Sequence, residues 1–197
     1  MKWREHTYAV PVRREVDPAR LATIDPAALE TADESGFLAG NAMFQDLSGL
    51  SWADAATAVA AETELITRLK AAEDLDAEAE LVDEERYDAF ENADALWNLD
   101  VGVIGAVIVL SALGCAPVGS CNAGGFGGQH QGQHPYVTFY LPSAAMGEVL
   151  ALAAAAQVGL ILDEDGRAQL YSDHDLGLIR FAELAVSSQI GGAPYQR

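Results

Sequence analysis

The sequence predicts an α+β protein, in which a helical N-terminal region precedes a small antiparallel sheet with helices packed on one face, as in a split βαβ unit. Three observations lead to this class. Residues 51–72 have an alanine-rich helical pattern, residues 134–141 alternate as a strand does, and residues 143–190 read as helix, strand pair and helix. Elements in that order build an antiparallel layer covered by helices.

The first region, residues 1–95, is expected to be mixed and mainly helical. The stretch EHTYAVPV at its start alternates like a strand, and two prolines, Pro18 and Pro26, then separate short helical segments. A long helix is predicted to begin at Ser51, with Asp54 completing a capping box. The acidic run that follows, residues 73–94, is predicted to be a helix with a solvated face.

The second region, residues 96–190, is expected to contain the sheet. Its segment Val101–Leu113 is strongly apolar but shorter than the ~20 residues that cross a bilayer, so it predicts a buried helix. A glycine-rich loop, residues 115–134, carries both cysteines and two histidines. Residues 191–197 read as a loose tail, and the two regions are expected to form one compact unit.

The last elements follow from pattern and turn chemistry. HPYVTFYL alternates as a strand, and residues 143–157 carry an apolar stripe that predicts a helix capped by Ser143. GLILDEDGRAQLYS predicts a hairpin that turns at Asp165 and Gly166, two residue types that accept a positive φ. A final helix is expected from Asp173 to Val186.

The charge of the chain limits its partners. The formal net charge is −19, and nineteen of the 30 acidic residues lie between Glu30 and Asp100, where only three basic residues occur. Direct binding to nucleic acid or to an anionic membrane is not expected, because both would repel this surface. A basic protein partner is compatible with the charge, although such acidic runs are most often simply solvated.

The start of the sequence lacks the apolar run of a secretory signal, and we expect a cytoplasmic protein. In that compartment its two cysteines, Cys115 and Cys121, are expected to be free thiols, metal ligands or reactive groups rather than a disulfide.

The glycine-rich loop supports several hypotheses. Zinc accepts two thiolates and two imidazoles, and the chain offers Cys115, Cys121, His130 and His134 in that order. The histidine spacing suits zinc, whereas the gap between the cysteines is longer than in common zinc knuckles. We therefore expect no cofactor, with zinc as the alternative.

A catalytic hypothesis uses Cys121 as the nucleophile and His130 or His134 as the base. Glycine amides after the cysteine would approach an oxyanion, and Asn122 or Asp173 would orient the reacting groups. Known cysteine-hydrolase signatures are missing from the sequence.

Two further hypotheses for the loop are anion binding and a purely structural role. The GGFGG segment resembles an anion cradle in composition, but it lacks the lysine and hydroxyl residue of a P-loop. In the structural reading the loop passes closely over the core, and Phe126 anchors it there.

From these observations we expect a non-enzymatic acidic binding or regulatory protein, which engages a protein partner through its acidic helices, its loop or both. The alternative is a small cysteine- and histidine-dependent hydrolase or transferase, and a zinc-binding structural protein is the third hypothesis. The substrate or partner and the oligomeric state have no signature in the sequence.

Overall fold

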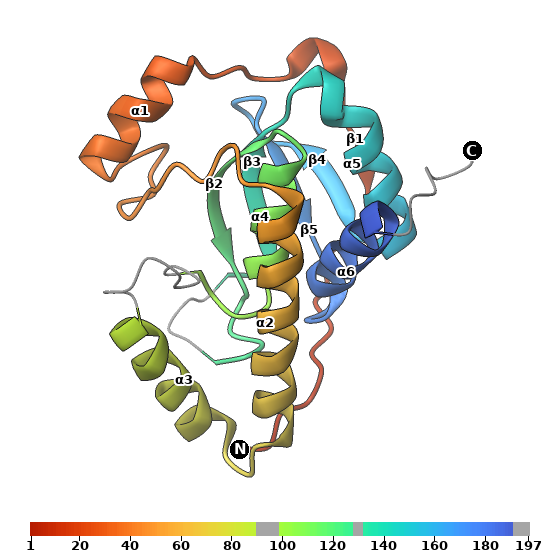
Figure 1. Cartoon of the computed structure of the whole chain (residues 1–197). Helices are drawn as coiled ribbons and strands as arrows, with labels where there is room; N and C mark the ends of the chain where they lie inside the picture. The colour runs from red at the N-terminus through yellow and green to blue at the C-terminus, as the bar shows by residue number, and fades with distance from the viewer. Residues whose placement is uncertain (90–98, 128–131, 191–197) are drawn as a thin grey trace.

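The computed structural model of the chain describes residues 1–89, 99–127 and 132–190. Within these residues the chain forms six helices and a five-stranded mixed sheet, which confirms the α+β class (Figure 1). The helices are α1 (Pro26–Ser35), α2 (Trp52–Ala71), α3 (Leu75–Ala89), α4 (Ile104–Ala112), α5 (Ser143–Ala156) and α6 (Gly177–Ile190), with a 3-10 turn at Pro18–Arg20. The strands are β1 (Arg14–Glu15), β2 (Ala116–Cys121), β3 (Tyr136–Tyr140), β4 (Gly159–Leu162) and β5 (Ala168–Tyr171).

The strands lie in the order β1, β4, β5, β3, β2. All neighbouring pairs are antiparallel except β1 and β4, which run in parallel. The sheet is therefore mixed, whereas the sequence predicted a purely antiparallel one. Strands β3 and β4 are joined by α5 and flank β5, which runs opposite to both. The parallel edge was not predicted because β1 has only two residues.

The two faces of the sheet differ in what covers them. Side chains on the inner face, among them Val137, Phe139 and Leu170, are completely buried beneath the helices. Figure 1 shows α2 and α4 in front of this face, with α6 beside them. The opposite side, which we call the outer face, carries Tyr136, Thr138, Tyr140, Ile161 and Gln169.

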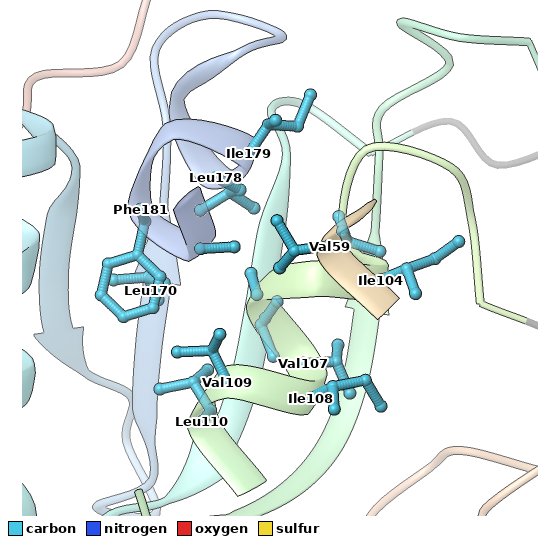
Figure 2. Packing of buried hydrophobic residues seen from close by; sticks show 14 of the residues in the cluster. Val59, Ile104, Val107, Ile108, Val109, Leu110, Leu170, Leu178, Ile179 and Phe181 are labelled. Atoms are coloured by element: carbon cyan, nitrogen blue, oxygen red, sulfur yellow. The ribbon is translucent and has the colours of Figure 1, made fainter. Parts of the chain in front are cut away.

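Helix α4 is the centre of the core. Every residue from Ile104 to Ser111 is buried, because α2, α6 and β2 surround the helix. Figure 2 shows its side chains between Val59 of α2 and Leu178 and Phe181 of α6. The expected buried helix is confirmed, and in the described residues no helix combines the length and apolar character of a membrane span.

The helix starts agree only partly with the predictions. Ser51 and Asp54 form the expected capping box at the start of α2. Helix α5 begins after Pro142 without a side-chain cap, so the predicted cap by Ser143 is wrong. Helix α6 begins at Gly177 rather than near Asp173.

Two strand predictions need correction. The alternating residues 5–12 form only an isolated bridge between Thr7 and His174, because their backbone-to-backbone bonds with the rest of the chain go to residues 173–175, which follow the end of β5. Residues 116–121, expected to be loop, form β2, which pairs with β3 through a bulge between Pro117 and Gly119. The predicted hairpin of β4 and β5 is present, and at its turn Gly166 alone has a positive φ, of 83°.

Candidate functional site

Cys121 is the last residue of β2 and pairs with Tyr136 of β3, so its side chain lies on the outer face. The residue is 6% exposed, and its Sγ accepts a hydrogen bond from the Ala123 amide at 3.3 Å. Gly132 passes directly over the thiol, since a Cβ at that position would lie 2.9 Å from Sγ. The thiol is therefore covered by the glycine-rich loop.

Cys115 lies at the other end of β2. It is 1% exposed, and burial raises the pKa of its thiol to about 12. Six residues of extended strand separate two positions by about 20 Å, whereas zinc holds thiolates at about 2.3 Å. Cys115 and Cys121 therefore do not ligate a common ion, and the part of the chain that the structure describes contains no group of three or more potential metal ligands.

His134 precedes β3, and its ring packs against Tyr136 of β3 and Tyr171 of β5. Its ring centroid is 5.3 Å from that of Tyr171 and 6.3 Å from that of Tyr136, and burial lowers the pKa of the imidazole. In the described residues no hydrogen bond joins His134 to Cys121. The other predicted base, His130, lies outside the described residues, so the catalytic set stays a prediction.

The loop after Cys121 is held by its own hydrogen bonds. The buried Asn122 side chain donates to the carbonyl oxygens of Val101 and Gly127 at 2.9 and 3.2 Å, and it accepts from the Gly124 amide at 2.7 Å. Phe126 is 3% exposed and stacks on Trp3 at 5.8 Å between ring centroids. The expected role of Phe126 as an anchor in the core is confirmed.

The loop glycines Gly124, Gly125 and Gly127 have backbone N–H groups that already donate hydrogen bonds, so these groups are not available to bind an anion. The amide of Gly124 donates to Asn122 Oδ1, while those of Gly125 and Gly127 donate to carbonyl oxygens inside the loop. A Cβ at Gly125 would lie 2.3 Å from a carboxylate oxygen of Asp175. An anion beside this loop would therefore meet a buried negative charge.

Asp175 organises a cluster that the sequence did not indicate. Its carboxylate is completely buried and accepts hydrogen bonds from the His6 amide and the Tyr8 hydroxyl, both at 2.7 Å. The His6 ring places Nδ1 3.2 Å from the same carboxylate, and about half of this side chain is exposed. Burial, together with the bond to Asp175, raises the pKa of Tyr8.

The other residues proposed from sequence to orient a catalytic centre have structural contacts. Asp173 offers its backbone oxygen to the Tyr8 amide at 2.7 Å. Asn122, as described above, closes its own loop. The pair His6 and Asp175 was missed because 169 residues separate them and neither stands in a recognisable motif.

Two hollows border the sheet. One, of about 840 Å³, lies between residues 39–47 and strands β2 and β3, and we call it the edge hollow. The other, of about 720 Å³, lies between residues 10–20 and strands β4 and β5, and we call it the strap hollow. His134 lines the strap hollow, and Tyr136 lines the edge hollow.

The acidic helix α3 packs on α2 through its apolar side. Arg68 of α2 pairs with Glu78 and Glu85, whereas Glu80 and Glu84 are exposed to solvent. These contacts agree with a solvated acidic face.

Comparison of the chain with protein-family models, curated protein sequences and solved structures finds no match.

Proposed function

We propose that the chain is a binding protein that holds an extended segment of a protein partner in the edge hollow. The supporting observation is this hollow of about 840 Å³ beside β2, which is an edge strand of the sheet. An edge strand presents backbone donors and acceptors to an added strand, and a neighbouring hollow can accept its side chains. In β2 the Val118 oxygen already accepts from Asn41 Nδ2 at 2.8 Å, so the added segment would use the other backbone groups of this strand or displace Asn41.

Large hydrophobic side chains are exposed to solvent around the edge hollow. Met43, which lines it, is 68% exposed, and Phe37, two residues before the lining segment, is 56% exposed. They are two of the four large hydrophobic residues exposed in the described part of the chain. Exposed apolar groups beside a concavity favour a contact that buries them.

The charged lining residues of the hollow are already satisfied. Arg167 donates to Asp163 at 2.8 Å, so neither charge is left unpaired for a ligand. Gly119 of β2 borders open space, because a Cβ there would meet nothing within 4 Å. The partner segment is therefore expected to bind through backbone bonds and apolar side chains, and the acidic surface elsewhere would favour a basic partner.

The experiment places a photo-crosslinking amino acid at Met43 in the host cell, and the adducts are identified by mass spectrometry. Gly119→Arg places a long side chain at the hollow from a position where a Cβ meets nothing within 4 Å, while Gly147→Arg places the same side chain on open space of α5. A discrete adduct lost in Gly119→Arg and kept in Gly147→Arg supports the proposal. An adduct that persists in both variants, or none at all, contradicts it.

The acidic face of α3 is tested in the same cells by reversing the charges of Glu80 and Glu84. Loss of the adduct in that variant, with no effect of Gly119→Arg, would move the partner site from the edge hollow to α3.

A cysteine-dependent hydrolase is the second candidate, and His6, which contacts the buried Asp175, is a further candidate base beside the predicted loop histidines. A buried carboxylate that holds Nδ1 leaves Nε2 free to exchange a proton, as in hydrolase triads. Hydrolysis of an activated thioester that is lost in both Cys121→Ser and His6→Ala would support this candidate. Unchanged partner capture in Cys121→Ser would separate it from the binding function.

A further inference from the structure

The strap hollow has the size of a small-molecule site. Its volume of about 720 Å³ falls within the range of about 300 to 1,000 Å³ typical of ligand pockets. The outer face of β4 and β5 forms its floor, and the segment 10–20 forms its wall. Figure 1 shows the N-terminal segment rising from the lower end of α2 to β1 beside α5. Residues 10–20 are the upper part of it, which includes β1 and the 3-10 turn.

The wall is fixed at both ends. The Tyr171 hydroxyl accepts from the Arg13 amide and donates to the Pro11 oxygen, both at 2.9 Å, while the Arg13 oxygen accepts from Leu160 at 2.8 Å. At the other end the Ala22 amide donates to the Gly166 oxygen at 2.8 Å. A ligand would therefore meet a site that is already shaped, which lowers the entropic cost of binding.

Two charged side chains in the wall lack a partner in the described part of the chain. Arg13 and Glu15 are exposed, both line the hollow, and neither forms an ion pair there. The other two charges are engaged with the main chain, since Arg20 donates to the Asp163 oxygen at 3.3 Å and Asp17 accepts from the Ala19 amide at 2.9 Å. The hollow thus presents two positive and two negative groups, of which Arg13 and Glu15 have no bonded side-chain partner in the described part of the chain.

The placement of these two residues favours a ligand of matching length. Residues two apart on an extended strand point to the same side, and their Cα atoms lie about 7 Å apart. The charged ends of an extended dipeptide are separated by about the same distance, because two residues span about 7 Å. A free amino acid is shorter, and a polyphosphate would meet the carboxylates of Glu15 and Asp17.

The uncharged lining residues suit a ligand whose middle part is apolar and also carries hydrogen-bonding groups. Ile161 and Val16 offer apolar contact. Gln169 and His134 have no side-chain hydrogen bond within the described residues, and burial lowers the pKa of the imidazole. A peptide bond above this floor would find both a donor and an acceptor.

We propose that the strap hollow binds a dipeptide-class zwitterion, with its carboxylate on Arg13, its ammonium on Glu15 and its side chains over Ile161 and Val16. This site goes beyond the proposed partner site, because it lies over β4 and β5 and uses none of the edge-hollow residues named for that function.

Calorimetric titration of the full chain with leucylleucine, its N-acetyl form and its C-terminal amide tests the assignment. Both blocked forms are expected to bind about fivefold more weakly, as for loss of one ion pair of about 1 kcal/mol. In Arg13→Gln the dipeptide and its amide should bind equally, and in Glu15→Gln the dipeptide and its acetyl form should do so. Arg4→Gln, an exposed cation outside the hollow, is the matched control and should change nothing.

Three outcomes would overturn the proposal. They are absence of binding up to about 10 mM, unchanged discrimination in both variants, and equal binding of a dicarboxylate such as succinate. Circular dichroism confirms that the variants are folded, as expected for two exposed side chains. The crosslinking result at Met43 is independent of all these outcomes.

Discussion

At the scale of single residues, Glu62 has the most unusual position. It lies within α2 at 1% exposure, and its carboxylate accepts from the amides of Gly102, Ile104 and Gly105 at 2.8 to 2.9 Å. Helix α4 has no side-chain cap of its own at Val103. Glu62 therefore caps the central helix from a neighbouring helix, and satisfies amides that would otherwise be buried without a partner.

This position predicts a pH-dependent stability. Burial raises the pKa of Glu62 from 4.5 to about 7, while the three amides oppose the shift. Between these values the folded protein binds a proton that the unfolded chain has lost, so stability is greatest below the lower value and falls as pH rises to about 7. The loss amounts to about 3 kcal/mol.

Urea denaturation of the wild type and Glu62→Gln between about pH 5 and pH 8 measures this effect. The variant does not titrate at this position, so its free energy of unfolding should lack the decline. A constant difference between the two proteins across the window would show that Glu62 does not titrate there.

A second residue-scale prediction concerns Asp175. Replacing it with Ala removes both acceptor oxygens and leaves the His6 amide and the Tyr8 hydroxyl without them, which should cost about 2 to 3 kcal/mol. Hydrogen exchange should accelerate in residues 3–10, because their anchor is weakened. His6→Ala removes a half-exposed ring and should cost less than about 1 kcal/mol, so equal effects of both variants would contradict this role.

At the scale of elements, helix α4 requires a glycine at its closest contact. A Cβ at Gly105 would lie 2.8 Å from Glu62 Oε2 and 3.0 Å from both Ala182 and Val59. Alanine would add about 1 kcal/mol of helix propensity, but overpacking costs about 1 to 3 kcal/mol and here also displaces the cap. Gly105→Ala should therefore lower the melting temperature.

Gly147 on α5 is the matched control, since a Cβ there meets nothing within 4 Å. Gly147→Ala should stabilise the protein by about 0.5 to 1 kcal/mol in calorimetry. Stabilisation by both substitutions would mean that the contact around Gly105 relaxes without cost.

Elements defined by local pattern could be predicted from the sequence. The apolar run of α4, the capping box of α2 and the alternation of β3 each carry their own signal. Strand β2 carries none, because APVGSC contains a proline and a glycine and becomes a strand only by pairing with β3 across a bulge. The parallel edge strand β1 likewise depends on β4, about 150 residues later in the chain.

At the scale of the whole molecule, the candidate site is built from distant segments. The N-terminal segment brings Trp3 to Gly125, His6 to Asp175 and Arg13 to Tyr171. Sequence reasoning identified Cys121 and Phe126 because a dense glycine-rich loop is visible in one stretch. His6 and Asp175 form no local pattern, and Glu62 resembled any other carboxylate on an acidic helix, so their roles required the tertiary structure.

The distribution of charge over the molecule predicts a response to salt. Five of the 11 basic residues lie in the first 20 positions, which leaves the rest of the chain strongly acidic within a net charge of −19. Self-repulsion of this kind destabilises a compact state, and salt screens it. The melting temperature should rise by a few degrees as sodium chloride increases from about 20 to 500 mM, because the Debye length falls from about 20 to 4 Å. A triple variant tests this explanation. Glu64→Gln, Glu80→Gln and Glu84→Gln together remove three exposed carboxylates that form no ion pair within the described residues. The variant should have a higher melting temperature than the wild type at low salt, and its melting temperature should rise less as salt is added. A fall in melting temperature with salt would instead show that ion pairs such as those of Arg68 outweigh the repulsion.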